Sequence, residues 1–395
     1  MKLKHVMTYL GIACVAIVCS IALTGCPSNS GGVGNDSGPI RVGTLLSLTG
    51  TVGEFGQRSL QGIQLAVEEI NAKGVMDGRK FEIDTQDTRS EAKDAVSAYR
   101  KLTASGNVNF IVGDVYSTTS MAVAPLAESD HVLMLAPGAS NPKFRFMGDY
   151  IFRNWTSDEF DGRAMADYAF EKAGVKNCGV IYQQVDYTAG LAKAFNDNFT
   201  QLGGNILSYE ALSEDASDAR QVVVKVLNSN PSAIYVCATG KASGVIVKYL
   251  REANFKGQIF CNLTVDTPEF MKIAKNYADG IIFSTPAFDL TDKNPRVQKF
   301  ASAFKAKFGD APDIAAGHAY DAMYILADAI KIAGSTDPGK VKDALYTIKD
   351  FPGVTGRTTF DKYGDVTKPV FIKKFVNGKS QKLEQFDVTS PGGSH

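Results

Sequence analysis

"LMLAPGASNP", residues Leu133 to Pro142, is the stretch that decides the fold. The first four residues are apolar without a break, which is typical of a short strand that is covered on both faces. Proline, glycine and small residues follow at once and end the strand in a corner that carries no large side chain. Such a corner lets another group approach the backbone. We therefore expect the end of this strand to lie at a binding surface.

The neighbouring sequence repeats this strand at regular intervals and places a helical pattern between consecutive strands. The pattern restarts after Trp155, so the chain contains two similar halves. Alternation of apolar strands with amphipathic helices predicts an α/β fold with two doubly wound parallel-sheet lobes. The expected strands are 40–48, 81–87, 110–114, 131–136, 178–184, 205–212, 233–238, 257–262 and 280–286, and the expected helices lie near 60–70, 92–102, 121–128, 162–172, 189–202, 219–227, 242–252 and 268–277.

Local signals refine this pattern. Thr88 and Glu91 have the spacing of a capping box at a helix start. Pro312 and Pro338 lie where a first helical turn accepts proline. Residues 370–386 read as a hairpin around Asn377-Gly378.

The segment after Pro286 is mainly helical and suggests that the chain returns to complete both halves. We therefore predict discontinuous domains. The first lobe comprises 40–155 plus 287–360, and the second comprises 156–286 plus 361–390.

The N-terminus has the features of a secretory signal. Lys2 and Lys4 precede an apolar run that ends in Leu23-Thr24-Gly25-Cys26. We expect residues 1–25 to be a lipoprotein signal peptide, because this end resembles a lipobox whose cysteine, Cys26, is lipidated. The alternative is an ordinary cleavable signal. Residues 26–39 are rich in Gly, Ser and Asn and are predicted to be a flexible tether.

Composition excludes several classes of protein. The chain of 395 residues balances 42 basic against 42 acidic residues and shows no basic stripe, so nucleic acid is not an expected partner. Beyond Cys26, three cysteines remain after the signal: Cys178, Cys237 and Cys261. Cys237 and Cys261 either form a disulfide or are buried as small hydrophobic residues. No metal-like spacing of Cys and His occurs, and we expect no metal and no cofactor.

Two strand ends in the first half carry hydroxyl groups. One is Gly113 to Ser120, "GDVYSTTS", and the other is the corner after Leu135. Ligands of open parallel sheets bind beyond the carboxyl ends of the strands, and helix N-termini bind anions there. The two ends together predict a site for a carboxylate. The alternative is that Ser117, Thr118 and Thr119 only cap their helix.

Longer motifs resemble the leucine/isoleucine/valine-binding branch of type I periplasmic binding proteins. They are "LLSLTGTVGEFGQRSLQGIQLAVEEINAKGV", "FIVGDVYSTTS", "LAPGASNP", "YIFRNWTSD", "QQVDYTAGLA" and "GHAYDAMYILADAI", in family order over nearly the whole mature chain. The resemblance implies two lobes joined by a three-crossing hinge, with a ligand bound in the cleft between them.

The same resemblance implies ligand contacts at individual positions. Thr118 and Ser140 match hydroxyl donors to a ligand carboxylate, beside Ser117 and the backbone of Ala139. Phe55, Tyr116 and Tyr187 match aromatic walls, with packing as the alternative for each. Trp155 either fills the hinge core or stacks on a ring of the ligand.

Two departures from the family pattern concern the ligand's amino group. Aligned through "TPEF", Leu263 stands where an acidic residue holds the ammonium group in the family, and Thr239 replaces a tyrosine. Burial of an ammonium group without a carboxylate costs several kcal/mol. We therefore expect a small carboxylate ligand that is amino-acid-like but lacks the amino group. Asp266 or Asp114 would restore an amine site if the loop were shifted.

The sequence predicts a binding protein and not an enzyme. "GTVGEFG" lacks the dinucleotide spacing, and the motifs of hydrolases are absent. A hydrolase or a dehydrogenase on this scaffold is the remote alternative. The resemblance implies an extracytoplasmic, lipid-anchored monomer that serves ABC permease and ATPase subunits. A ligand-sensing module of a receptor, or an amide sensor, is the alternative within binding.

Overall fold

The structure is a computed structural model that describes residues 38–214 and 218–387. The predicted signal peptide, the lipidation site Cys26 and nearly all of the predicted tether lie outside these residues. From Pro39 onward the described chain belongs to one compact unit. Within the described ranges, no helix combines the length and the apolar character that a membrane span requires.

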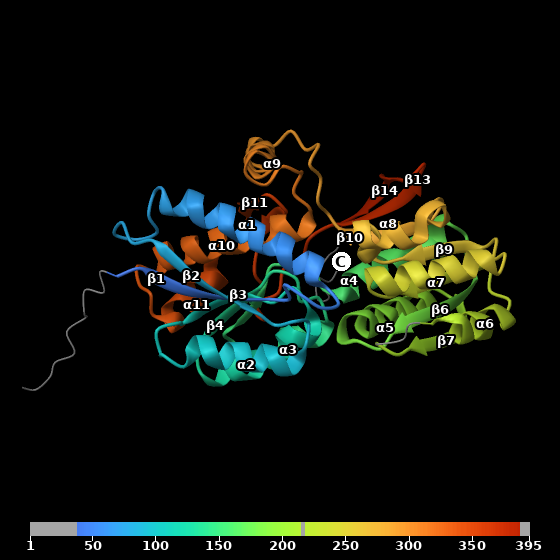
Figure 1. The fold of residues 1–395 in the computed structure, drawn as a ribbon, viewed down its shortest axis with the longest axis horizontal. Helices are drawn as coiled ribbons and strands as arrows, with labels where there is room; N and C mark the ends of the chain where they lie inside the picture. The colour runs from blue at the N-terminus through green and yellow to red at the C-terminus, as the bar shows by residue number, and fades with distance from the viewer. Residues whose placement is uncertain (1–37, 215–217, 388–395) are drawn as a thin grey trace, which may run out of the picture. The chain divides into compact units, whose positions relative to one another are not determined.

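The first half of the chain forms a parallel sheet with the strand order β2-β1-β3-β4-β5. Figure 1 labels β1 to β4 of this sheet. Every neighbouring pair in it runs parallel, with Val42 opposite both Ile83 and Phe110. The carboxyl ends of β1, β3 and β4 therefore lie at one edge. The strands are β1 (Ile40–Leu46), β2 (Phe81–Asp87), β3 (Phe110–Gly113), β4 (Leu133–Ala136) and β5 (Ile151–Arg153).

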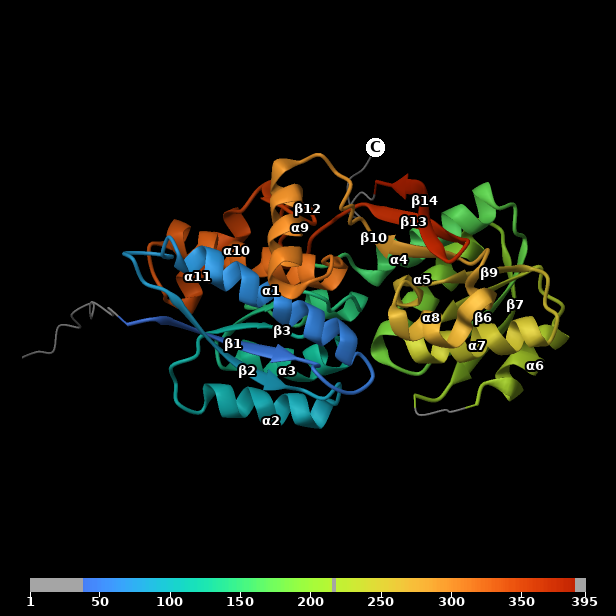
Figure 2. The ribbon, with the colours of Figure 1, turned by 45° about the horizontal axis from the view of Figure 1, so that its top comes forward.

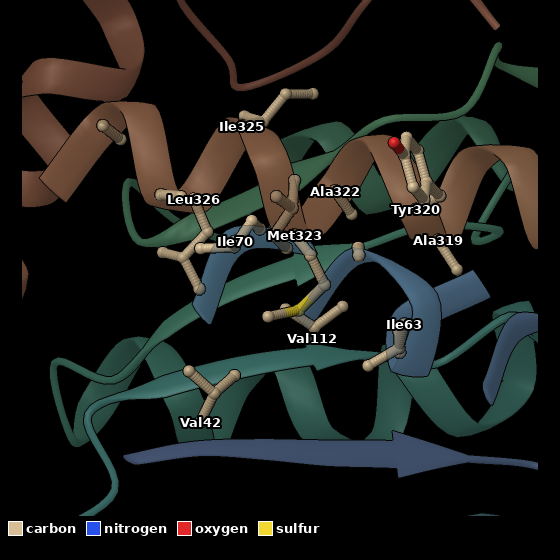
Figure 3. Packing of buried hydrophobic residues seen from close by; sticks show 14 of the residues in the cluster. Val42, Ile63, Ile70, Val112, Ala319, Tyr320, Ala322, Met323, Ile325 and Leu326 are labelled. Carbon is tan, nitrogen blue, oxygen red and sulfur yellow. The ribbon is translucent and has the colours of Figure 1, made fainter. Parts of the chain in front are cut away.

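Both faces of this sheet are buried, which explains the unbroken apolar strands. Val42 and Val112 belong to the cluster beneath α1 (Gly53–Asn71) and α10 (Ile314–Ala333). Ile111 and Met134 belong to the cluster on the side of α2 (Ala92–Thr103) and α3 (Ser117–Ser129). Neighbouring residues of a strand point to opposite faces, so two covered faces require an apolar residue at every position. Figure 3 shows Met323 of α10 and Ile63 of α1 over Val42 and Val112.

The second sheet has the order β14-β13-β10-β9-β8-β6-β7. Its strands β10, β9, β8, β6 and β7 run parallel, and the hairpin β13–β14 adds an antiparallel edge. The strands are β6 (Asn177–Gln183), β7 (Asn205–Leu212), β8 (Ala233–Cys237), β9 (Gln258–Cys261), β10 (Ile282–Pro286), β13 (Val370–Val376) and β14 (Lys379–Phe386). Cys178, Cys237 and Cys261 are buried and free, so the disulfide alternative is wrong.

Helices cover both sheets (Figure 2). Those of the first sheet are α1 (Gly53–Asn71), α2 (Ala92–Thr103), α3 (Ser117–Ser129), α9 (Pro295–Phe308), α10 (Ile314–Ala333) and α11 (Pro338–Thr347). Those of the second are α4 (Asp158–Asp167), α5 (Asp186–Gln201), α6 (Arg220–Asn228), α7 (Gly240–Glu252) and α8 (Pro268–Ala274). Short turns of helix are η1 (Pro142–Phe146), η2 (Tyr168–Lys172), η3 (Leu263–Val265) and η4 (Lys275–Ala278).

The chain passes between the sheets three times, after β5, after β10 and before β13. Between the last two passages it completes the first core with α9, α10, α11 and the small hairpin β11 (Phe351–Gly353) and β12 (Gly356–Thr358). The three-crossing arrangement predicted for the two lobes is confirmed. Val366 packs in the first core, and the exact lobe boundaries stay a prediction.

The element pattern was predicted well, with local exceptions. The hairpin at Asn377-Gly378 is confirmed, with positive φ at both turn residues.

The predicted capping box is wrong, because Glu91 caps α2 without a side-chain bond and Thr88 bonds Asp114 instead. Pro338 opens α11 as expected, whereas α10 begins after Pro312, with Asp313 as its cap. Strand β5 was not predicted, and α4 begins at Asp158 rather than Gly162.

Candidate functional site

A pocket lies between the strand ends of the first sheet and elements of the second. It contains roughly 500 Å³ of empty space, including space open to solvent. Loops after β1, β3 and β4 contribute to it, and so do α5 and η3. Its lining consists of Val52, Phe55, Val115, Tyr116, Ser117, Gly138, Ser140, Trp155, Tyr187, Leu263, Thr264 and Ala315.

The bare corner after β4 is approached by protein backbone on one side. A Cβ atom on Gly138 would stand 2.7 Å from the Cα and carbonyl oxygen of Val115, so only glycine allows the two loops to meet. The hydroxyl of Ser117 accepts hydrogen bonds from the main-chain N–H groups of Ser140 and Asn141, both at 3.2 Å. Ser117 therefore has a structural role, which is to hold the corner after β4, in addition to its predicted role as a ligand donor.

The hydroxyl groups of Thr118 and Tyr116 approach each other, and that of Tyr116 also approaches the Glu214 side chain. Thr118 Oγ1 and the Tyr116 hydroxyl are both buried, and neither makes a hydrogen bond of ordinary geometry within the described chain. The Ser140 side chain lines the pocket directly. Buried polar groups are rarely left unpaired in native proteins. These hydroxyls are therefore candidates for bonds to a ligand, although Thr118 itself is not part of the pocket lining.

Aromatic side chains make up much of the wall. Phe55 comes from α1, Tyr116 from the loop before α3, and Tyr187 from α5. Trp155, from the first passage between the sheets, is 5% exposed and lines the same pocket. The ring of His318 lies behind Trp155 at a centroid distance of 4.3 Å. Burial lowers the pKa of His318 well below its ordinary value, so it backs the indole as a neutral ring.

The remaining predicted site residues lie in different places. Leu263 begins η3 and lines the pocket, as the alignment through "TPEF" requires. Ala139 is buried behind the corner, where its carbonyl accepts a bond from Arg153. Thr239 does not line the pocket, because its N–H and hydroxyl both donate to Gln183 Oε1 at 3.0 and 2.9 Å.

Neither of the two acids named as substitutes for the amine site reaches this pocket. Asp114 is 1% exposed and accepts bonds from Ser47, Thr88 and Thr119. It joins the ends of β1 and β3. Asp266 lines a larger outer cleft and bonds Lys373 and Ser380.

Two buried acids on α4 were missed by the sequence reasoning. Asp158 and Asp161 are 1% and 3% exposed, and each has one carboxyl oxygen without a partner in the described chain. Asp158 contacts the hydroxyl of Ser140. Its charge helps burial to raise the pKa of Tyr187. The pKa of Asp158 is raised well above its ordinary value, mainly by burial and also by the nearby charge of Asp161. Asp158, Asp161 and the buried Met165 have the spacing i, i+3 and i+7 of one helix face, and this spacing could have predicted that both acids are buried.

The corner also touches the second sheet's helix α5. Asn141 Nδ2 donates to the main-chain oxygen of Asp186 at 2.6 Å, next to Tyr187. A Cβ atom on Gly190 would stand 3.0 Å from Asn141 Nδ2 and 3.2 Å from Pro142 Cδ. The small residues of "GASNP" and "YTAG" therefore allow close approach between the two lobes.

Comparison with known proteins agrees with this architecture. The family model described as periplasmic binding protein matches residues 39–380. The chain belongs to this family. The Leu/Ile/Val-binding protein homolog 3 of Brucella melitensis is 30% identical over 348 residues, which cover 87% of this chain and 94% of that protein.

Solved structures give the same result for this periplasmic binding protein. A leucine binding protein from Thermotoga maritima matches with a TM-score of 0.83 at 30% identity, over 88% of this chain and 99% of that one. A branched-chain amino acid transporter substrate binding protein from Streptococcus pneumoniae, in complex with isoleucine, matches with a TM-score of 0.80 at 28% identity, over 87% and 99%. The predicted resemblance, the fold class and the non-enzymatic role are confirmed. The family also implies an extracytoplasmic location and a small-molecule ligand.

Proposed function

We propose that this periplasmic binding protein captures a small carboxylate with an apolar body and presents it to the permease and ATPase subunits of an ABC importer. The pocket supports this proposal through its position between the two sheets, because closure of two lobes around a ligand couples binding to a conformational signal. The Streptococcus pneumoniae protein is named as a transporter substrate binding protein, which supports delivery over sensing.

The observation that carries the ligand class is a group of buried hydroxyls in or next to an otherwise apolar pocket, among which Thr118 Oγ1 makes no hydrogen bond of ordinary geometry within the described chain. Ser140, Thr118 and Tyr116 offer donors beside the N-terminus of α3. A helix N-terminus with free N–H groups favours an anion. Val52, Phe55 and Leu263 surround the rest of the space with apolar groups.

The pocket also bears on the ligand's amino group. Leu263 lines the pocket, so the charge that the resemblance places there is missing. An amine-free ligand follows from this only if no other acid reaches the pocket. Asp158 is not among the residues that line the pocket, but it contacts the hydroxyl of Ser140, which is.

A thermal-shift screen tests the proposal. Purified protein is incubated with amino acids and with aromatic, aliphatic and branched carboxylates. Carboxylates with apolar bodies should raise the melting temperature in proportion to RT ln(1 + [L]/Kd). Uncharged amides of the same acids are the controls. Equal shifts from acids and their amides would contradict the carboxylate site.

Membrane attachment through Cys26 stays part of the proposal. A lipid chain on Cys26 would keep the binding protein near its importer, and mass spectrometry of the mature N-terminus checks it. A chain that starts at Cys26 and carries diacylglycerol is the expected product. Replacement of Cys26 by serine should release the protein from the membrane fraction, and retention of that variant would contradict lipid anchoring.

A further inference from the structure

Tyr187 brings a buried hydroxyl group to the pocket from α5 of the second lobe. The residue is 9% exposed, and its hydroxyl oxygen accepts a hydrogen bond from Asn262 Nδ2 at 3.1 Å. A phenol can accept in this way and still donate its own proton. Within residues 38–214 and 218–387, no protein group accepts that proton with hydrogen-bond geometry. Tyr187 therefore has an unused donor at the wall of the pocket.

The Tyr187 hydroxyl keeps its proton in the neutral pH range. Its pKa is raised well above the ordinary value, mainly by burial and also by the charges of Asp158 and Asp161. A tyrosine with its ordinary pKa of about 10 is already protonated at neutral pH, and this shift holds the proton more firmly. Buried polar groups in native proteins are nearly always hydrogen-bonded. The unused proton therefore indicates an acceptor that the pocket receives from outside the chain.

Asn262 fixes the phenol oxygen from behind the pocket wall. It follows β9, is fully buried, and is not one of the residues that line the pocket. Its Oδ1 accepts a hydrogen bond from the hydroxyl of Thr264 at 2.9 Å. Because the oxygen end of the amide is held by Thr264, the nitrogen end faces Tyr187. The amide thus joins two residues of the pocket lining, one from α5 and one from η3.

We propose that Asn262 is a positioning residue that directs the O–H bond of Tyr187 into the pocket, where it donates a hydrogen bond to the ligand carboxylate. This inference rests on the proposed function and adds a donor from the second lobe to the hydroxyls of the first. Asn262 occupies one lone pair of the phenol oxygen, so the O–H bond has to point away from the amide. A hydroxyl that accepts one hydrogen bond also donates more strongly in the next.

A donor on the second lobe couples recognition of the acid to closure of the lobes. Ser140 lines the pocket from the first lobe and Tyr187 from the second. A ligand that bonds both side chains binds the closed form better than a form in which the lobes are apart, and this difference shifts the equilibrium toward closure. Hydrogen bonds to a carboxylate are also stronger than those to a neutral amide. Tyr187 should therefore increase the preference for an acid over its amide, and Asn262 should do so through Tyr187.

A double-mutant cycle measured by isothermal titration calorimetry tests this inference. The probes are 4-methylpentanoate and 3-phenylpropanoate, each compared with its primary amide. Tyr187→Phe should weaken binding of the acids by about tenfold or more, and binding of the amides by less. Asn262→Leu, which keeps the shape of the side chain without its donor, should weaken binding of the acids by about fivefold. The double variant should bind no more weakly than Tyr187→Phe alone, because Asn262 then has no hydroxyl on which to act.

A purely structural role of Asn262 predicts a different result, since the two losses would then multiply to about fiftyfold in the double variant. Asn198→Leu is the matched control, because the Asn198 amide lies on the same helix as Tyr187 and donates to the carbonyl of Ala194 at 2.7 Å. This control should bind the acids like the wild type. Asn262→Ala takes the place of Asn262→Leu in the cycle if the leucine variant does not fold.

Multiplied losses, or wild-type affinity in Tyr187→Phe or in the Asn262 variant, overturn the positioning role while the carboxylate function stands. A loss in Asn198→Leu as large as that in the Asn262 variant overturns it as well. If neither acid binds the wild type, or if acids and amides bind it equally, the proposed function itself fails, and this inference fails with it.

Discussion

Ser140 and Thr118 are the side chains on which the carboxylate proposal depends most directly. The Ser140 side chain lines the pocket, and Thr118 Oγ1 is buried without a bond of ordinary geometry. Hydrogen bonds to a charged group contribute about 1.5–3 kcal/mol each. Loss of either hydroxyl should therefore be visible in the dissociation constant.

Replacement of Ser140 or Thr118 by alanine should weaken binding of a carboxylate by ~1–3 kcal/mol, measured by calorimetry. Ser243→Ala is a suitable control, because the Ser243 hydroxyl is buried and bonds the carbonyl of Ala238 within the second lobe. Unchanged affinity in both site variants would remove the hydroxyl groups from the ligand site.

Leu263 tests the alignment from which the missing charge was inferred. It lines the pocket at 6% exposure, so a carboxylate placed there should face the ligand. Leu263→Glu should raise the preference for an amino acid over its amine-free analogue by about tenfold, measured by competition binding. Leu263→Gln, of the same shape without the charge, should not. Equal behaviour of the two variants would show that position 263 does not meet an amine.

At the scale of elements, the contact between the corner and α5 links the two lobes without touching the pocket lining. The Asn141 side chain donates to Asp186, and its other end accepts a bond from the N–H of Lys143 at 2.9 Å. Gly190 provides the space for this contact. A contact that exists when the lobes are together stabilises the closed form relative to the open form.

Asn141→Ala should therefore lower ligand affinity by about 1 kcal/mol through faster dissociation, measured by stopped-flow kinetics together with small-angle scattering of the bound state. Asn198→Ala removes a comparable side-chain bond, to the carbonyl of Ala194 within α5 alone. It should alter stability without altering affinity. A reduced association rate with unchanged dissociation would contradict a role in holding the lobes together.

Elements were predicted where periodicity was strong and missed where tertiary contacts decide. The β2 strand and the β7 strand have the predicted bounds, since apolar or alternating runs between turn residues leave little choice. Strand β5 has three residues and follows a 3-10 turn, so its pairing with β4 gives almost no sequence signal. Thr88 does not cap α2 as predicted, because its hydroxyl donates instead to the buried carboxylate of Asp114, which is a stronger acceptor.

At the scale of the whole molecule, the crossing segments are joined by buried charges. Arg153 is fully buried and bonds both oxygens of Asp365, while Lys368 donates to Asn154 at 2.9 Å and to Thr355 at 2.7 Å. These bonds hold the first and last passages side by side, where Thr156 and Val366 also form a bridge. The passages between the lobes therefore form a segment braced by side-chain bonds.

Lys368 gives this hinge a pH dependence. Burial lowers the pKa of Lys368 to about 8, below the value near 10.4 of an exposed lysine. Between these values the unfolded chain binds the extra proton, so the contribution of Lys368 to the free energy of unfolding rises with pH by up to about 1.4 kcal/mol per unit. Below the folded pKa the cost of the buried charge is constant.

Chemical denaturation of the wild type and of Lys368→Met across this window checks the prediction. The difference in stability between the two proteins should shift in favour of the wild type as pH rises, because other titrating groups are common to both. Lys362→Met, which changes another lysine of the same crossing, should follow the wild type. A difference that stays constant with pH would show that Lys368 keeps its ordinary pKa in the folded protein.

The sequence by itself determined the alternation of strands and helices, the two halves and the family, because these depend on local periodicity and on motifs contiguous in the chain. The resemblance also named Phe55, Ser140, Tyr187 and Leu263 as ligand contacts, and the structure places all four in the lining of one pocket. Only the tertiary structure showed that Thr239 bonds Gln183 and does not line the pocket, and that Asp114 accepts a bond from Thr88 at the end of the sheet. It also showed that Asp158 contacts Ser140. These depend on which distant groups share a buried space, and burial is set by packing of the whole chain rather than by neighbours in sequence.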